Sequence, residues 1–271
     1  MLKIKLPGTS NEFVFNASSS IKNVELELRN VLFPYVTETN NFDHSAIYIE
    51  LNSQYIELGL SGRKKKKIPF SKKQDAYRII MNIIRDNLHL EENFCFLHGA
   101  SLAINQKGCL FIGESTAGKS TLCAFFDCYD NVVCLSDDLI IIDTEQLNIY
   151  PIAKYVHLRS PLLDVLANQL SPTLPPFNNL IERFEYPVSQ TRFNARAKVE
   201  YIFVLHRGYS KTRISLKENG YDSLIENMYL PYQIKNNIKS AIRLQSIVPI
   251  YDLYYDDMVS CLNTISKFLS D

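Results

Sequence analysis

The segment at residues 113–120 has the residue types and spacing of a phosphate-binding loop. It reads Gly-Glu-Ser-Thr-Ala-Gly-Lys-Ser and fits the pattern G-x-x-x-x-G-K-[ST] at every fixed position. Gly113 and Gly118 permit backbone conformations that a Cβ atom would block, so that successive N–H groups can point at one phosphate. Lys119 supplies an ammonium group for the β- and γ-phosphates, and Ser120 supplies a hydroxyl for Mg²⁺. The motif predicts a site for a nucleoside triphosphate with Mg²⁺.

The segments on either side of this motif are those that a phosphate loop requires. An apolar run at residues 109–112 precedes it, and a helical stretch at residues 121–126 follows it, with the positive end of the helix towards the anion. The motif does not distinguish purines, and we take ATP as the expected nucleotide. The residues predicted to contact the nucleotide are Gly113, Glu114, Ser115, Thr116, Ala117, Gly118, Lys119, Ser120 and Thr121.

An acidic pair, Asp137 and Asp138, begins 17 residues after Ser120. An acidic residue on a buried strand beside a phosphate loop is where nucleotide-hydrolysing proteins hold Mg²⁺. Adjacent side chains of an extended strand point to opposite sides, so one carboxylate can serve the metal and the other a hydroxyl nucleophile. A solvated turn is the alternative, which the apolar residues on both sides of the pair disfavour. Asp143, on the same strand, is a weaker metal candidate.

A single histidine, His98, lies in the sequence Leu-His-Gly-Ala beside an apolar strand. A lone histidine in such a place usually has a structural role. The alternative is that His98 pairs with an aspartate of the site and assists or tunes it as a general base. Its own sequence context does not decide between the two.

Apolar periodicity predicts a small α+β segment over residues 1–60 and an α/β sheet further on. An amphipathic helix that begins at Ser71 and extends to Leu88 joins the two parts. The order strand, Gly-rich turn, helix, strand around the motif is typical of βαβ units. We predict one domain over residues 1–92 and a second over residues 93–271. Strands are predicted at 94–97, 109–112, 132–142 and 201–205, and helices at 119–126, 159–170, 221–244 and 258–269.

The composition limits the classes of protein to which the chain can belong. Its 271 residues carry 29 basic and 29 acidic side chains, so the formal net charge is zero. Nucleic-acid binders usually carry a basic excess, and no apolar stretch approaches the roughly 18 residues of a membrane helix. Residues 1–7 lack the apolar block of a signal peptide. We expect a cytoplasmic protein that binds neither nucleic acid nor membrane.

Two further features have ordinary structural interpretations. The basic run from Arg63 to Lys67 is typical of a solvated turn, and a docking patch for an acidic or phosphate-bearing partner is the alternative. The six cysteines form no C-x-x-C pair and are predicted to be buried free thiols rather than zinc ligands. They are Cys95, Cys109, Cys123, Cys128, Cys134 and Cys261.

Three motifs together resemble the catalytic domain of HPr serine kinase. They are the Leu-His-Gly-Ala segment with His98, the loop at residues 113–121 and the Ser-Asp-Asp segment with Asp137 and Asp138. The chain is similar to a wider HPr-kinase-like group that includes stand-alone kinases of bacterial peptide-biosynthesis clusters, such as lasso-peptide kinases. The match covers about residues 94–143. It implies a P-loop kinase core of the HPr kinase and phosphoenolpyruvate carboxykinase type, here over residues 93–271 behind a small α+β N-terminal module.

The resemblance also implies roles for individual residues. Lys119 would contact the phosphates, and Ser120 and Asp137 would hold Mg²⁺. Asp138 would accept the proton of a serine hydroxyl, and His98 would be its partner. Which of the two aspartates has which role stays open.

The sequence departs from this family at two places. Thr116 stands where the family usually has a glycine, and the family's downstream arginine- and glycine-rich loop has only loose equivalents at residues 156–159 and 191–196. The reverse dephosphorylation and HPr as the substrate are therefore not expected. Arg159, Arg192 and Arg196 are candidates for neutralising charge in the transition state.

The sequence thus predicts a kinase that uses ATP and Mg²⁺ to phosphorylate a hydroxyl group. The expected partner is a peptide or small protein that bears a serine, such as a ribosomally made peptide precursor, and a homo-oligomer is possible. A small-molecule kinase and a nucleotide-binding regulator with weak ATPase activity are the alternatives.

Overall fold

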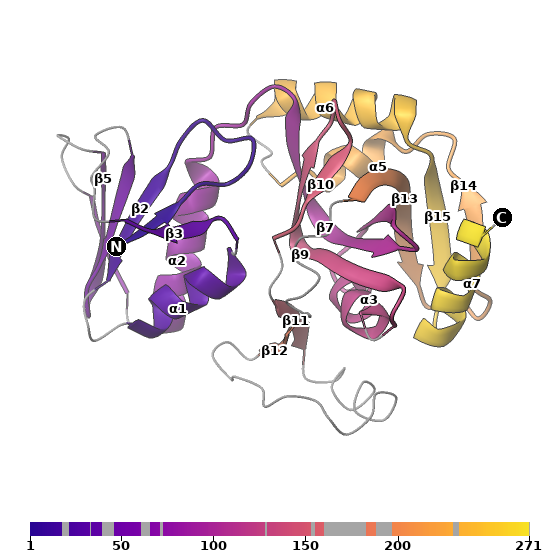
Figure 1. Cartoon of the computed structure of the whole chain (residues 1–271), viewed down its shortest axis with the longest axis horizontal. Helices are drawn as coiled ribbons and strands as arrows, with labels where there is room; N and C mark the ends of the chain where they lie inside the picture. The colour runs from indigo at the N-terminus through magenta and orange to yellow at the C-terminus, as the bar shows by residue number, and fades with distance from the viewer. Residues whose placement is uncertain are drawn as a thin grey trace. The chain divides into compact units, whose positions relative to one another are not determined.

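The chain folds into two compact units, Met1–Glu92 and Asn93–Asp271, each built on its own sheet (Figure 1). The structure is a computed structural model. It describes residues 1–17, 22–32, 34–39, 46–60, 66–70, 73–127, 129–152, 155–159, 183–187, 197–229 and 233–270. The fold is mixed α/β, as the sequence predicts.

The first unit is a six-stranded sheet in the order β3-β1-β2-β4-β5-β6, with two helices. Strands β1 and β4 alternate buried and half-buried residues, which is the pattern of a sheet with one face on the core. The predicted α+β character of this part is confirmed. Its elements are β1 (Leu2–Ile4), β2 (Phe13–Ala17), α1 (Lys22–Val31), β3 (Val36–Glu38), β4 (Ile47–Leu51), β5 (Tyr55–Leu60), β6 (Lys66–Pro69) and α2 (Lys73–Asp86).

The end of the basic run is a strand, so the turn interpretation is wrong for Lys66 and Lys67. Both lie in β6, which pairs with β5. Lys67 forms an ion pair of 3.3 Å with Glu57 and lies 4.5 Å from the ring centre of Tyr55. Cross-strand pairs of this kind stabilise a sheet edge. Arg63, like Ser71 at the predicted helix start, lies outside the described residues.

The second unit is a seven-stranded sheet in the order β10-β9-β7-β8-β13-β15-β14. Strands β8, β13 and β15 are parallel to one another, and β7 is antiparallel to both of its neighbours. The predicted βαβ order is therefore only partly right, because β7 lies between β8 and β9. The elements are β7 (Phe94–Ile104), β8 (Lys107–Ile112), α3 (Lys119–Phe126), β9 (Val132–Asp143), β10 (Asn148–Tyr150), β11 (Tyr155–Arg159), β12 (Arg183–Pro187), β13 (Ala197–Arg207), β14 (Arg213–Leu216), α5 (Tyr221–Glu226), α6 (Ile234–Ile247), β15 (Ile250–Tyr255) and α7 (Met258–Ser270).

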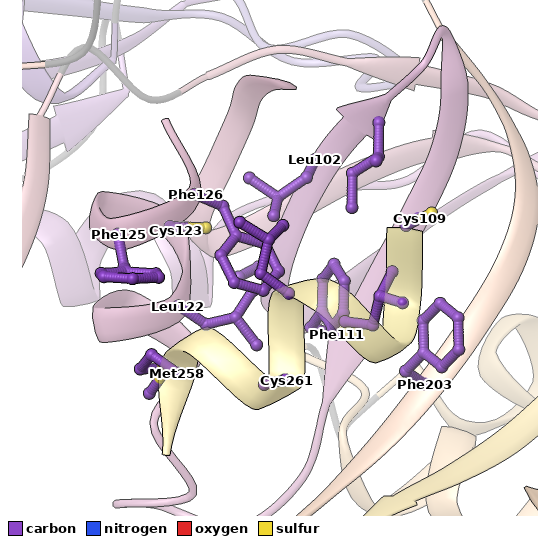
Figure 2. Close-up of a cluster of buried hydrophobic side chains, with 14 of the residues drawn as sticks. Leu102, Cys109, Phe111, Leu122, Cys123, Phe125, Phe126, Phe203, Met258 and Cys261 are labelled. Carbon is purple, nitrogen blue, oxygen red and sulfur yellow. The ribbon is translucent and has the colours of Figure 1, made fainter. Parts of the chain in front are cut away.

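Helices cover both faces of this sheet. On one face, α3 and α7 pack on Leu102, Phe111 and Phe203, as Figure 2 shows with Leu122 and Cys261 from the two helices. On the other face, buried residues of α5 and α6 pack against a second apolar cluster of the same strands. Burial on both faces is the reason that these strands read as continuous apolar runs.

Two predicted helices differ from the structure. The predicted helix at residues 221–244 is two helices, α5 and α6, because the chain between them pairs with β7 through the bridge Leu97–Met228. Arg159, predicted to begin a helix, ends strand β11 instead, and residues 160–170 lie outside the described part. The predicted helices at 119–126 and 258–269 are confirmed.

The cysteines of the described residues are free and buried, as predicted. Burial raises the pKa of the Cys95 thiol to about 12, so at neutral pH it is a protonated, apolar side chain. Cys128 lies outside the described residues. In the described part of the chain, no helix combines the length and the apolar character needed to span a membrane.

Candidate active site

The loop at residues 113–120 leaves the end of β8 in the middle of the sheet and leads directly into α3. Gly113 and Gly118 have φ angles of +142° and +94°, which residues with a Cβ rarely adopt. Gly113 also lies so close to β13 that a Cβ atom would be 3.1 Å from the carbonyl oxygen of Leu205. Both glycines of the motif are therefore required by the backbone. Thr116 has a φ of +77° as well, although it is β-branched.

Lys119 is held against its own loop. Only 8% of the residue is exposed, and its Nζ donates hydrogen bonds to the carbonyl oxygens of Gly113 at 2.7 Å and Glu114 at 2.9 Å. Burial lowers the pKa of Lys119, and the charges of Asp137 and Asp138 act in the opposite direction. An ammonium group that is poorly solvated and bound only by neutral carbonyls can gain from an incoming anion.

Ser120 and Asp137 form a pair at the start of α3, where the loop ends. The Ser120 hydroxyl donates to Oδ1 of Asp137 at 2.9 Å, and Asp137 is 9% exposed. Mg²⁺ in nucleotide sites is usually bound by one or two protein oxygens together with substrate phosphates and water. The described residues contain no cluster of three or more His, Cys, Asp or Glu that could form a complete protein cage. The Ser120–Asp137 pair fits a Mg²⁺ ion that is shared with a nucleotide.

Asp138 and His98 form the second pair, on neighbouring strands β9 and β7. His98 Nδ1 lies 3.3 Å from Oδ1 of Asp138 and 3.1 Å from its carbonyl oxygen. The side chain of Asp138 is 54% exposed and that of His98 is 40% exposed, so both are accessible to a substrate. The residue after His98 is Gly99, where a Cβ atom would lie 2.7 Å from the carbonyl oxygen of Phe111 on the other neighbour of β7, strand β8. The two pairs together bring a buried carboxylate and an accessible carboxylate to one loop.

Two residues that the sequence analysis missed support this arrangement. Asn227 Oδ1 accepts the N–H of Gly113 at 3.3 Å, and its backbone carbonyl accepts the N–H of His98 at 2.6 Å. The buried Tyr255 hydroxyl donates a hydrogen bond to the carbonyl of Ala117. Asn227 therefore links the start of the loop at Gly113 to His98, and Tyr255 holds the loop near its end, at Ala117. No motif in the sequence marks either residue.

Of the remaining candidates, Asp143 lies away from this site. Asp143 is wrong as a metal candidate, because it lies six residues beyond Asp137 and its Oδ1 accepts the N–H groups of Glu145 at 2.8 Å and Gln146 at 3.1 Å. It stabilises the turn between β9 and β10. Arg192 and Arg196 lie outside the described residues.

The other predicted nucleotide contacts differ in accessibility. Glu114, Ser115 and Thr116 are exposed, whereas Ala117 and Thr121 are buried, at 8% and 3% exposure. Thr121 therefore offers a nucleotide little more than its backbone.

Among the comparisons with known proteins, only the one with solved structures finds matches. No protein-family model matches the sequence, and no curated protein matches it. Among solved structures, the chain is similar to the HPr(Ser) kinase/phosphatase from Coxiella burnetii. The identity is 11% and the TM-score 0.34, over 65% of this chain and 93% of that one. At this TM-score the similarity supports no inference on function, so the roles proposed below come from the residues of this chain.

Proposed function

We propose that the chain is a kinase that transfers the γ-phosphoryl group of ATP to the serine hydroxyl of a peptide or small protein. The observation that carries this proposal is the side-by-side placement of Ser120–Asp137 and His98–Asp138 at the end of a glycine loop. Nucleotide binding alone needs the loop and a metal ligand. A second, accessible carboxylate with a histidine partner is what a hydroxyl substrate needs in addition.

Each side chain has a defined task in this reaction. The loop N–H groups and Lys119 bind the phosphates, and Lys119 exchanges its two carbonyl partners for phosphate oxygens. Ser120 and Asp137 would hold Mg²⁺, which would neutralise part of the phosphate charge. Asp138 accepts a hydrogen bond from the substrate hydroxyl, and His98 keeps that carboxylate in place.

The transfer step exchanges one phosphorus–oxygen bond for another. The serine oxygen forms a bond to the γ-phosphorus while the bond from that phosphorus to the bridging oxygen of ADP breaks. The hydroxyl proton passes to Asp138, and ADP leaves with the electrons of the broken bond. The protein contributes position and charge, and no covalent intermediate is required.

The test is transfer of labelled phosphate from ATP to the short peptides encoded beside this gene. We expect label on a peptide serine with the unmodified chain and none with Lys119→Ala or Asp138→Asn. Asn keeps the shape of Asp and tolerates the positive φ of residue 138, so loss of activity in Asp138→Asn reports chemistry and not folding. Asp143→Asn, at the other end of β9, is the matched control and should keep full activity.

Three results would contradict the proposal. Near-normal transfer by Asp138→Asn would show that Asp138 is not the base. Label that appears only as free phosphate would indicate a regulator with weak ATPase activity. Label on a small metabolite and on no peptide would indicate a small-molecule kinase.

A further inference from the structure

Strand β13 extends past the point where β8 ends and the glycine loop begins. Ile112, the last residue of β8, is paired with Val204, and β13 continues for three more residues to Arg207. At about 3.3 Å per residue, Arg207 lies about 10 Å beyond the start of the loop, on the strand next to it. Arg207 therefore lies beyond the carboxyl end of β8, on the side of the loop where a bound nucleotide would lie.

Arg207 is on the same face of the sheet as the loop and α3. Side chains of a strand alternate, and Phe203 and Leu205 both pack in the cluster that contains α3. Arg207 is also the direct strand partner of Tyr255, whose hydroxyl binds Ala117 in the loop. Its charge acts on that hydroxyl: burial raises the pKa of Tyr255, and Arg207 opposes this rise. Arg207 therefore faces the loop from the side opposite to β7 and β9.

Arg207 is exposed, and its positive charge is not neutralised by any of the residues that the structure describes. Within the described ranges, no carboxylate forms an ion pair with it. The nearby Asp252 is bound by His206 at 2.7 Å and by Lys217 at 3.0 Å, so its charge is already balanced. Among the described residues, Arg207 therefore has no carboxylate partner of the kind that His206 and Lys217 have in Asp252.

We propose that Arg207 binds the α- and β-phosphates of the nucleotide, the part that is not transferred. This inference rests on the nucleotide binding proposed above. Asp137 and Asp138, which would lie beside the γ-phosphoryl group, come from β9, on one side of the loop. The α- and β-phosphates must then extend to the other side, where Arg207 presents a planar donor group suited to phosphate oxygens. Arg207 is a binding residue and makes or breaks no bond.

The test compares binding of MgATP and MgADP to the full chain by isothermal titration calorimetry. Arg207→Met should raise the dissociation constants of both nucleotides by about tenfold or more, because a charge-assisted bond to phosphate is lost. Arg207→Lys should lie between Arg207→Met and the unmodified chain. Lys211→Met is the control, since it removes an exposed positive charge from the same connection between β13 and β14, and we expect less than a twofold change.

The possible results separate this inference from the proposed function. If Arg207→Met binds both nucleotides as the unmodified chain does, while Lys119→Ala does not bind, the Arg207 assignment is wrong and the function stands. Weakening of ATP alone would place Arg207 at the γ-phosphate and overturn the assignment. Equal weakening in Lys211→Met would reduce the effect to general charge and overturn it as well. If the unmodified chain binds neither nucleotide, both proposals fail.

Discussion

The φ angle of Thr116 leads to a prediction whose sign can be worked out from the structure. Thr116 has φ +77° and an exposed side chain in the middle of the glycine loop. The left-handed conformation costs a residue with a Cβ about 1–2 kcal/mol, whereas glycine adopts it freely. Because the side chain is exposed, its removal sacrifices little packing. The backbone conformation therefore dominates the effect of a substitution at this position.

The informative quantity is the stability of Thr116→Gly relative to Thr116→Ala. At an ordinary position glycine is less stable than alanine by about 0.5–1 kcal/mol, because the unfolded glycine chain has more freedom. At residue 116 the relief of strain exceeds this cost, so we expect Thr116→Gly to be the more stable by about 0.5–1 kcal/mol. The next residue is the matched control. Ala117 is buried and has no positive φ, so Ala117→Gly should destabilise the protein.

The assay is urea denaturation of the three variants and the unmodified chain, with free energies of unfolding compared at equal slope. A stabilising Thr116→Gly, relative to Thr116→Ala, beside a destabilising Ala117→Gly would identify the positive φ of residue 116 as the cause. If Thr116→Gly were less stable than Thr116→Ala, residue 116 would not have the left-handed conformation, and the reasoning on loop strain would be refuted.

Two further predictions concern the residues that fasten the loop. Tyr255→Phe removes the hydroxyl that donates to the carbonyl of Ala117 and leaves that carbonyl without this donor. The free energy of unfolding should therefore fall by about 1–3 kcal/mol. An unchanged denaturation midpoint would contradict this. Asn227→Ala removes the acceptor for the N–H of Gly113 and should weaken MgADP binding severalfold. Ser223→Ala is the control and should not weaken it, because Ser223 contacts Asn227 only through its backbone carbonyl. Equal affinities of the two variants for MgADP would show that Asn227 does not order the loop.

The local parts of the site could be predicted from the sequence because they depend on neighbouring residues. The glycine spacing, the apolar run before it and the helical residues after it predicted α3 with its observed bounds. The same holds for the second strand of the motif, since the apolar residues around Asp137 predicted β9. The periodicity of apolar residues over ten to twenty positions is enough to predict a single helix or strand.

The contacts that complete the site could not be predicted in this way. Asn227 and Gly113 are 114 residues apart, and Tyr255 and Ala117 are 138 residues apart. Such pairs arise when β8, β13 and β15 come together in one sheet, which a single sequence does not specify. The break between α5 and α6 was also missed, although Pro231 lies in the segment between them and is a recognised helix-breaking signal.

The conformation of Asp138 shows why alternation along the strand was an incomplete guide to the acidic pair. A regular strand would direct Asp137 and Asp138 to opposite faces, yet the charges of both act on Lys119. Asp138 has φ +70° inside β9, although Asp137 and Leu139 on either side keep their pairing with β7. Of the other non-glycine residues with positive φ in the described part, Thr116 lies in the glycine loop, and Asn105, Gln106 and Leu147 lie at the turns that connect strands.

At those turns the reversal of the chain requires the conformation, whereas Asp138 lies inside β9, between residues that stay paired with β7. The cost of about 1–2 kcal/mol at Asp138 is therefore sustained by the ladder with β7, which also carries His98. This conformation allows the exposed carboxylate of Asp138 and the buried carboxylate of Asp137 to lie at the same loop. Strain inside a well-paired strand, at the residue we assign as the base, is an argument for that assignment that is independent of any motif.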